Sequence, residues 1–161
     1  MRDYILIGHS AGAALCFQTL SATPLAPKAV VGLAGIYDLG ALVEEYPQYR
    51  SLVEAAFGGV GAEVESRPWD YASPAKSPMC DGCKMVFENG HRVVLMRTTR
   101  DELLSEKQTE LMGRAIGQRL VVGGLLETVV GDFGGHSEML RNERVWEVLE
   151  RVVREALNVI G

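Results

Sequence analysis

The sequence predicts an α/β fold in which a mostly parallel sheet of about four strands is flanked by helices. Strand-like and helix-like segments alternate along the chain, as in a parallel sheet whose strands are joined by crossover helices. The strand-like segments are short, continuous apolar runs, as expected for strands that are buried on both faces. The chain has 161 residues and no internal repeat, so we treat residues 1–161 as one domain.

Local patterns place each element in order. The four strands are expected at residues 4–7, 29–33, 92–96 and 125–130. The first helix, at 11–20, is rich in Ala and Leu, and the second, at 39–57, has a break at Pro47 and ends at two glycines. Helices at 106–116 and 145–157 follow the last two strands, and the latter has apolar residues at helical spacing. Residues 58–78, where Gly, Pro and Ser are frequent, are expected to be mostly loop.

The composition excludes several kinds of partner. The net charge of −5 comes from 21 acidic and 16 basic residues without a Lys/Arg cluster, so we expect no nucleic acid and no membrane as partners. No apolar run reaches the roughly 18 residues of a membrane span. Three cysteines without a signal peptide favour a reducing compartment, so we expect a cytoplasmic protein. Oligomeric state is left open, with a homo-oligomer among the alternatives.

Cys80 and Cys83 form a C-x-x-C pair. Two thiolates supply half of the ligands of a structural zinc ion, and no second pair completes the set. Redox-active pairs lie where a strand leads into a helix, whereas this pair lies in a loop. We therefore expect an ordinary surface loop, no metal and no cofactor. Trp69 and Trp146 are expected to pack inside the protein rather than to bind a ligand.

The segment Gly8-His9-Ser10-Ala11-Gly12 matches the G-x-S-x-G nucleophile elbow of α/β-hydrolases. A predicted strand enters the pattern and a predicted helix leaves it, as the elbow requires. The turn strains the serine backbone, and we expect side chains at Gly8 or Gly12 to clash with neighbouring elements. The helix aims its first N–H groups at a developing oxyanion, with Ala11 as the first expected donor. A glycine-rich turn without a catalytic role is the alternative.

A serine nucleophile needs a histidine as its base, and the chain contains three. His9 lies inside the elbow and is expected to point elsewhere. His91 precedes a strand, at the end of the sheet where this fold has no active site. His136 follows the last strand in a glycine-rich loop that can carry its ring over Ser10. The sequence therefore favours His136 as the base, and a surface histidine in a flexible loop is the alternative.

The third member of a triad is a carboxylate that orients the imidazole. Asp38, Asp101 and Asp132 each follow a predicted strand. Hydrolases of this fold usually take the acid from the strand before the histidine strand, which favours Asp101. Asp38 is expected to cap the helix that starts at residue 39, and it stays the second choice. The order Ser10, Asp101, His136 is the chain order of α/β-hydrolases.

Further motifs resemble kynurenine formamidase, particularly its fungal form. They are Gly35-Ile-Tyr-Asp38, Tyr46-Pro-Gln-Tyr-Arg50, Phe57-Gly58, Trp69-Asp-Tyr-Ala-Ser-Pro-Ala75, Arg100-Asp-Glu-Leu-Leu104 with Gln108, and Gly135-His136. The similarity extends over nearly the whole chain. The elbow and triad are shared by the whole superfamily, so the stretch 35–58 is what points to this family.

The resemblance implies hydrolysis of N-formyl-L-kynurenine to L-kynurenine and formate in tryptophan breakdown, with Ser10 as nucleophile, Asp101 as acid and His136 as base. The family also has a His-Gly-Gly motif far upstream of the elbow, whose N–H groups complete the oxyanion hole. Only seven residues precede Gly8, so we expect the C-terminal half of such a hydrolase, with residues 4–7 as an exposed sheet edge. A generic carboxylesterase or lipase-like hydrolase and a non-catalytic remnant are the alternatives.

Overall fold

The computed structural model describes residues 3–22, 27–58, 68–76, 92–118 and 125–158. In these residues a four-stranded sheet has the order β1-β2-β3-β4, and every pair of neighbouring strands is parallel. The strands are β1 (Ile5–His9), β2 (Ala29–Leu33), β3 (Arg92–Thr98) and β4 (Leu125–Gly131). The predicted parallel sheet is confirmed. β1 and β3 both run further toward their carboxyl ends than the apolar runs alone indicated.

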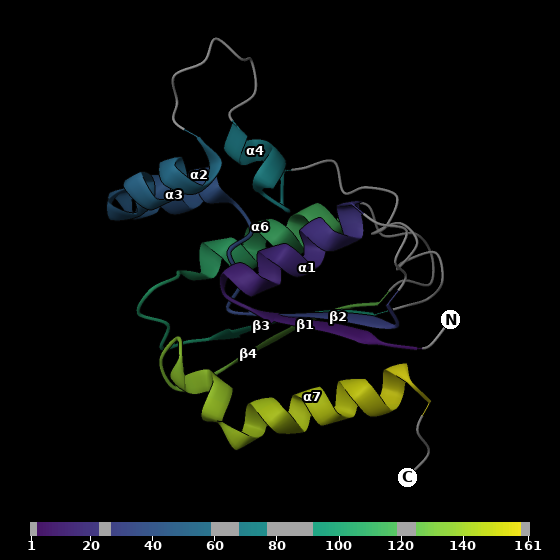
Figure 1. Ribbon diagram of the computed structural model, residues 1–161. Coiled ribbons are helices and arrows are strands. Elements are labelled where there is room, and N and C mark those ends of the chain that lie inside the picture. The colour runs from purple at the N-terminus through teal and green to yellow at the C-terminus, as the bar shows by residue number, and fades with distance from the viewer. Residues whose placement is uncertain (1–2, 23–26, 59–67, 77–91, 119–124, 159–161) are drawn as a thin grey trace.

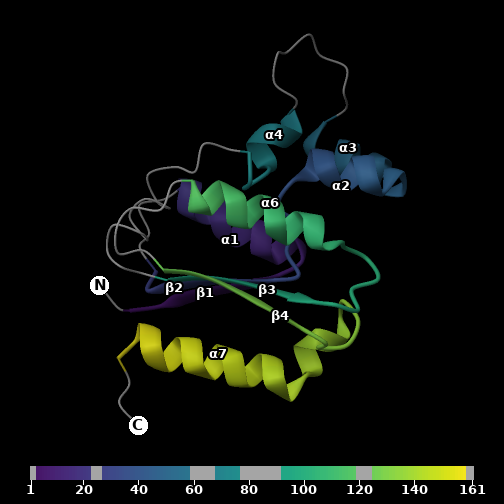
Figure 2. The same ribbon diagram turned by 180° about the vertical axis from the view of Figure 1, so that it is seen from behind.

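Helices cover both faces of the sheet, so the core has three layers (Figure 1). α1 (Ala11–Ala22) and α6 (Glu106–Gly117) pack on one face, and α7 (Glu143–Ala156) packs on the other. The view from behind shows the same separation, with α7 beneath the strands (Figure 2). Beyond α1 and α6 lie the short elements α2 (Leu39–Glu45), η1 (Pro47–Tyr49), α3 (Arg50–Phe57) and α4 (Pro68–Ala72). A 3-10 turn, η2 (Glu138–Arg141), precedes α7.

Successive residues of the central strands enter different cores. Val30 packs with residues of α1 and α6, such as Phe17, whereas Val31 packs with residues of α7, such as Leu149. Side chains alternate across a strand, so a strand between two helical layers must be apolar at every position. This is why β2, buried at all five residues, reads as a continuous apolar run.

Three expectations about the elements were incomplete or wrong. The helix predicted at 39–57 is divided into α2, η1 and α3, with Pro47 at the start of η1. The segment expected as loop contains α4, whose Trp69 is 2% exposed and, as predicted, packs in the interior. Trp146, in contrast, is 58% exposed, because Val145 and Leu149 take the buried face of α7. Cys80, Cys83 and His91 lie outside the described residues.

β1 is an edge of the sheet in the described part of the chain, because it pairs only with β2. Ile7 on this strand is 46% exposed, and Leu15 of α1 is 60% exposed. An apolar edge strand of this kind is open to pairing with another strand. None of the described helices has the length and apolarity needed to cross a membrane.

Candidate active site

The candidate nucleophile Ser10 lies in a strained turn between β1 and α1. Its φ of 55° is in the left-handed region, which non-glycine residues rarely adopt. Two backbone hydrogen bonds hold the turn: the Ser10 N–H donates to Leu33 O at 2.9 Å, and the Ile36 N–H donates to Ser10 O at 3.2 Å. The strain is therefore supported by the neighbouring strand β2 and the segment after it.

The two glycines of the elbow play different parts. A Cβ at Gly8 would overlap the carbonyl of Gly12, so the first glycine is required for the close approach of α1 to β1. A Cβ at Gly12 would meet no atom of the described residues within 4 Å. The expected clash is thus found at Gly8 and is wrong for Gly12 within the described chain. Ala11 is the first residue of α1, where the N–H has no acceptor inside the helix.

His136 and Asp101 are paired at the carboxyl ends of β4 and β3. The His136 Nδ1 lies 2.8 Å and 3.0 Å from the two carboxylate oxygens of Asp101, and both side chains are nearly buried. A carboxylate only accepts, so Nδ1 carries the hydrogen and Nε2 is left as the acceptor. The N–H groups of Leu103 and Leu104 donate to Asp101 Oδ1 at 3.0 Å and 2.9 Å, which fixes the carboxylate. In this arrangement the carboxylate fixes the orientation of the imidazole ring.

The loop that carries His136 is bonded to the end of β3. Thr98 Oγ1 donates to Gly134 O at 2.6 Å and accepts from the Phe133 N–H at 3.1 Å. Glu138 Oε2 accepts from the Gly135 N–H at 2.8 Å. Gly134 has a φ of +86°, a conformation that a residue with a side chain would adopt only under strain. The glycine-rich loop is therefore held in place by side chains on both sides.

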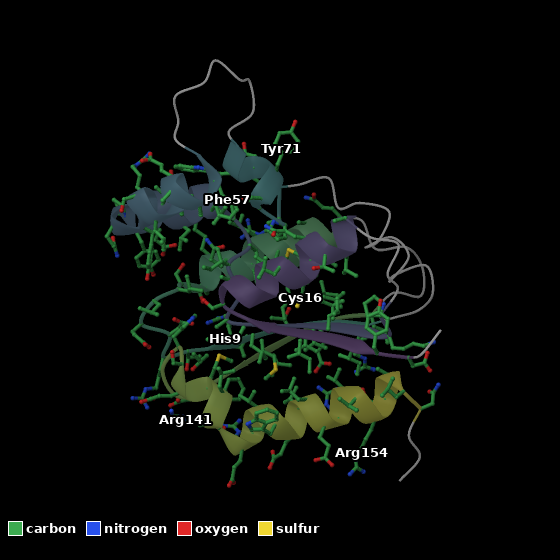
Figure 3. All side chains as sticks on the ribbon, viewed as in Figure 1. His9, Cys16, Phe57, Tyr71, Arg141 and Arg154 are labelled. Carbon is green, nitrogen blue, oxygen red and sulfur yellow. The ribbon has the colours of Figure 1, made fainter. Side chains whose placement is uncertain are left out.

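A cavity of about 470 Å³ opens above the elbow. Ser10 and His136 border it, and aliphatic and aromatic side chains of α1, α2 and α3 form most of its wall. Phe57, at the end of α3, is part of this wall and lies above α1 in Figure 3. The described lining contains no Lys, Arg, Asp or Glu side chain. The cavity suits an apolar or aromatic group next to the serine hydroxyl.

The remaining acidic candidates have other roles. Asp38 caps α2 as predicted, because its Oδ1 accepts from the Ala41 N–H at 2.8 Å. Asp132 is exposed, and its Oδ1 accepts from the Gly134 N–H at 3.1 Å. Only Asp101 of the three is hydrogen-bonded to the ring of His136.

Two residues near this site were missed by the sequence reasoning. His9, expected to point elsewhere, has its ring 4.6 Å from that of His136, and its Nε2 donates to His136 O at 3.0 Å. Glu102 Oε2 accepts from the His136 N–H at 2.8 Å. Their sequence positions could have indicated these two residues, because His9 precedes Ser10 and Glu102 follows Asp101.

The local environment shifts the pKa of both His9 and Glu102. Burial lowers the pKa of His9 below its usual 6.5, and this effect outweighs the hydrogen bond to His136 O, which acts in the opposite direction. The hydrogen bond from the His136 N–H is the largest cause of a lowered pKa for Glu102. Neutral His9 and ionised Glu102 are thus favoured. Among the described residues, no three His, Cys, Asp or Glu side chains lie together as metal ligands would.

Comparisons with solved structures define the class of fold. The chain superimposes on a puromycin hydrolase with a TM-score of 0.72 at 14% identity, over 97% of this chain and 22% of that one. It superimposes on the acylaminoacyl peptidase of Pyrococcus horikoshii with a TM-score of 0.64 at 16% identity, over 93% and 23%. With these likenesses, the parallel sheet and the elbow define an α/β-hydrolase fold.

Sequence comparison then identifies the relatives. The chain is 32% identical to the kynurenine formamidase of Meyerozyma guilliermondii in an alignment of length 154 that covers 89% of this chain and 55% of that protein. It is 31% identical to kynurenine formamidase avaC of Aspergillus versicolor, over 86% of this chain and 55% of that protein. No protein-family model matches the sequence. The chain is thus a relative of the kynurenine formamidases and spans about half of their length.

Proposed function

We propose that this chain carries the triad of a serine hydrolase of the kynurenine formamidase type, acting in tryptophan breakdown. One observation carries the proposal: Asp101 is hydrogen-bonded to His136 Nδ1 at 2.8 Å, while His136 and Ser10 border the same apolar cavity. In this role Ser10 is the nucleophile, His136 the base and Asp101 the acid that orients it. The similarity to kynurenine formamidases supports N-formyl-L-kynurenine as the substrate.

The proposed reaction has two stages. Ser10 Oγ attacks the formyl carbon of the substrate while His136 Nε2 takes the hydroxyl proton. The tetrahedral intermediate expels the aniline nitrogen, which receives that proton from His136, and a formyl ester on Ser10 remains. Water, deprotonated by His136, then attacks the ester, and formate leaves as His136 returns the proton to Ser10 Oγ. Asp101 stays ionised throughout and stabilises the imidazolium that forms in each stage.

The oxyanion of each intermediate needs hydrogen-bond donors. We propose the Ala11 N–H as one of them, since it stands at the start of α1 beside Ser10. The resemblance implies further donors from the family's His-Gly-Gly motif, which residues 1–161 do not contain. Each donor of an oxyanion hole typically contributes about 10²–10³ in rate.

A generic carboxylesterase is the second candidate function. It is favoured by the cavity lining, which offers no charged side chain to the amino-acid end of formylkynurenine in the described residues. An uncharged ester or a simple aryl formamide needs no charged partner in the cavity. For either function we propose a small-molecule substrate. A sparse, odd set of three cysteines fits a reducing compartment, so we also propose a cytoplasmic location.

The experiment compares hydrolysis of N-formyl-L-kynurenine, formanilide and p-nitrophenyl acetate by the chain and by Ser10→Ala. We expect both formamides to be cleaved, and all cleavage to be lost in Ser10→Ala. Labelling with a fluorophosphonate, followed by peptide mapping, should modify Ser10 alone. Cleavage of the ester without either formamide would support the carboxylesterase. Absence of labelling at Ser10 would identify a non-catalytic remnant.

A further inference from the structure

The main chain of His136 is hydrogen-bonded to a side chain at both of its polar groups. Its N–H donates to Glu102 Oε2 at 2.8 Å, and its carbonyl accepts from His9 Nε2 at 3.0 Å. These partners come from different segments, the end of β1 and the loop after β3, and each stands next to another member of the candidate triad: His9 precedes Ser10, and Glu102 follows Asp101. Each hydrogen bond therefore joins the histidine loop to the segment of one other triad residue.

His9 is well placed to hold the carbonyl. It is the last residue of β1, paired in register with Leu33 of β2, so its backbone is fixed by the sheet. Figure 3 shows it between α1 and the segment that leads into α7. A carbonyl only accepts, so Nε2 of His9 carries a hydrogen. Burial lowers the pKa of His9, which keeps the ring neutral beside the imidazolium that His136 forms during catalysis.

Glu102 holds the amide from the other side. The carboxylate lies close to the histidine loop: a Cβ at Gly135 would lie 2.7 Å from Glu102 Oε2, so a side chain at that position would displace the carboxylate. Its side chain is in solvent, so the hydrogen bond serves to place the loop rather than to build the core. Together with His9, Glu102 fixes the main chain of His136, from which the ring extends toward the cavity.

We propose that His9 and Glu102 are positioning residues, which hold the His136 main chain so that the ring stands between Asp101 and Ser10. The inference rests on the proposed function, since it takes His136 as the base. A base must come within about 2.6–3.2 Å of the proton that it removes, and a misplacement of about 1 Å can cost ~10² in rate. Neither residue lines the cavity beside Ser10, and each acts through His136.

The test pairs a disruptive and a conservative change at each position. His9→Phe and Glu102→Ala remove the donor and the acceptor, whereas His9→Gln and Glu102→Gln keep a donor and an acceptor at similar reach. Glu110→Ala removes a carboxylate of the exposed face of α6 and is the matched control. Each variant is labelled with a fluorophosphonate over a range of concentrations, and its thermal unfolding midpoint is measured.

We expect the disruptive changes to lower the maximal rate of Ser10 labelling about 10–100-fold, with the half-saturating concentration and the unfolding midpoint little changed. The glutamine variants should recover most of the rate, and Glu110→Ala should retain it. A structural role alone would lower the unfolding midpoint and would not be relieved selectively by glutamine. Unchanged labelling in both disruptive variants, or glutamine variants as slow as the disruptive ones, would overturn the proposal.

Amide hydrogen exchange separates this inference from the proposed function. If the parent chain is not labelled at Ser10, the serine hydrolase is refuted, but the hydrogen bonds to His136 can still be tested. Peptides that cover residues 132–141 should exchange faster in His9→Phe and Glu102→Ala, and at the parent rate in the glutamine variants. Exchange that is equal in all variants would show that neither side chain holds the loop.

Discussion

The exchange of Asp101 for asparagine separates the electrostatic role of this side chain from its structural one. Asp101 Oδ1 accepts from the N–H groups of Leu103 and Leu104, and Oδ2 lies 2.8 Å from His136 Nδ1. In Asp101→Asn, the amide oxygen can keep both backbone hydrogen bonds. The amide nitrogen then faces Nδ1, and because it can only donate there, the hydrogen of the imidazole must move to Nε2. In that tautomer Nε2 of His136 has no lone pair to accept the proton of Ser10.

The expected loss of turnover is large, and the expected loss of stability is small. The wrong tautomer lowers kcat by about 10⁴ in a Ser-His-Asp triad, which corresponds to about 5.5 kcal/mol of activation free energy. The free energy of unfolding should fall by only about 1–2 kcal/mol, because one charge-assisted hydrogen bond is lost and the side-chain volume is kept. Initial rates of formylkynurenine hydrolysis measure the first quantity, and denaturant unfolding measures the second.

The two rival carboxylates supply matched controls. Asp38→Asn keeps an acceptor that can cap α2, and Asp132→Asn changes an exposed side chain, so both should retain activity within a few-fold. The reasoning would be refuted if Asp101→Asn were nearly as active as the parent chain. Loss of activity in Asp38→Asn instead, with the fold intact, would assign the acid to the end of β2.

Three further predictions concern stability and association. Gly8→Ala should destabilise the chain by about 3 kcal/mol in denaturant unfolding, because the new methyl group overlaps the backbone of α1. Gly12→Ala should be neutral or stabilise the chain by up to about 1 kcal/mol. Equal effects of the two changes would contradict the packing argument. Burial lowers the pKa of His9 below 6.5 in the folded chain. As the pH falls, His9 therefore takes up a proton at a higher pH in the unfolded chain than in the folded chain. The free energy of unfolding should therefore fall as pH drops below about 6.5, less steeply in His9→Gln, and identical slopes would refute this account. Light scattering should show self-association through β1 that Ile7→Lys reduces more than Tyr71→Lys, a change at an exposed residue of α4, which lies outside the sheet; a monomeric parent chain would contradict this.

The sheet could be predicted from the sequence, but one helix could not. The central strands need apolar residues at every position because both faces are covered, and that requirement leaves a plain mark on the sequence. α4 leaves no such mark, since five residues cannot form a stable helix by local interactions alone. Its stability comes from burial of Trp69 and from Ser73 Oγ, which donates to Trp69 O at 2.5 Å. Contacts of that kind exist only after the chain has folded.

The same distinction applies to the candidate site. Parallel strands bring their carboxyl ends to one edge of the sheet, so the residues that follow β1, β3 and β4 must lie near one another, and Ser10 and His136 could be chosen on that ground. Asp38, Asp101 and Asp132 all follow strands, so the choice of Asp101 depended on the usual position of the acid in hydrolases of this fold. Sequence position cannot say which neighbours bond to which, because His9 and Glu102 reach His136 across 127 and 34 residues. Yet both stand directly beside a predicted triad residue. In a site assembled from strand ends, the residues adjacent to the reacting groups share the same edge, and their side chains are the nearest ones able to fix the geometry.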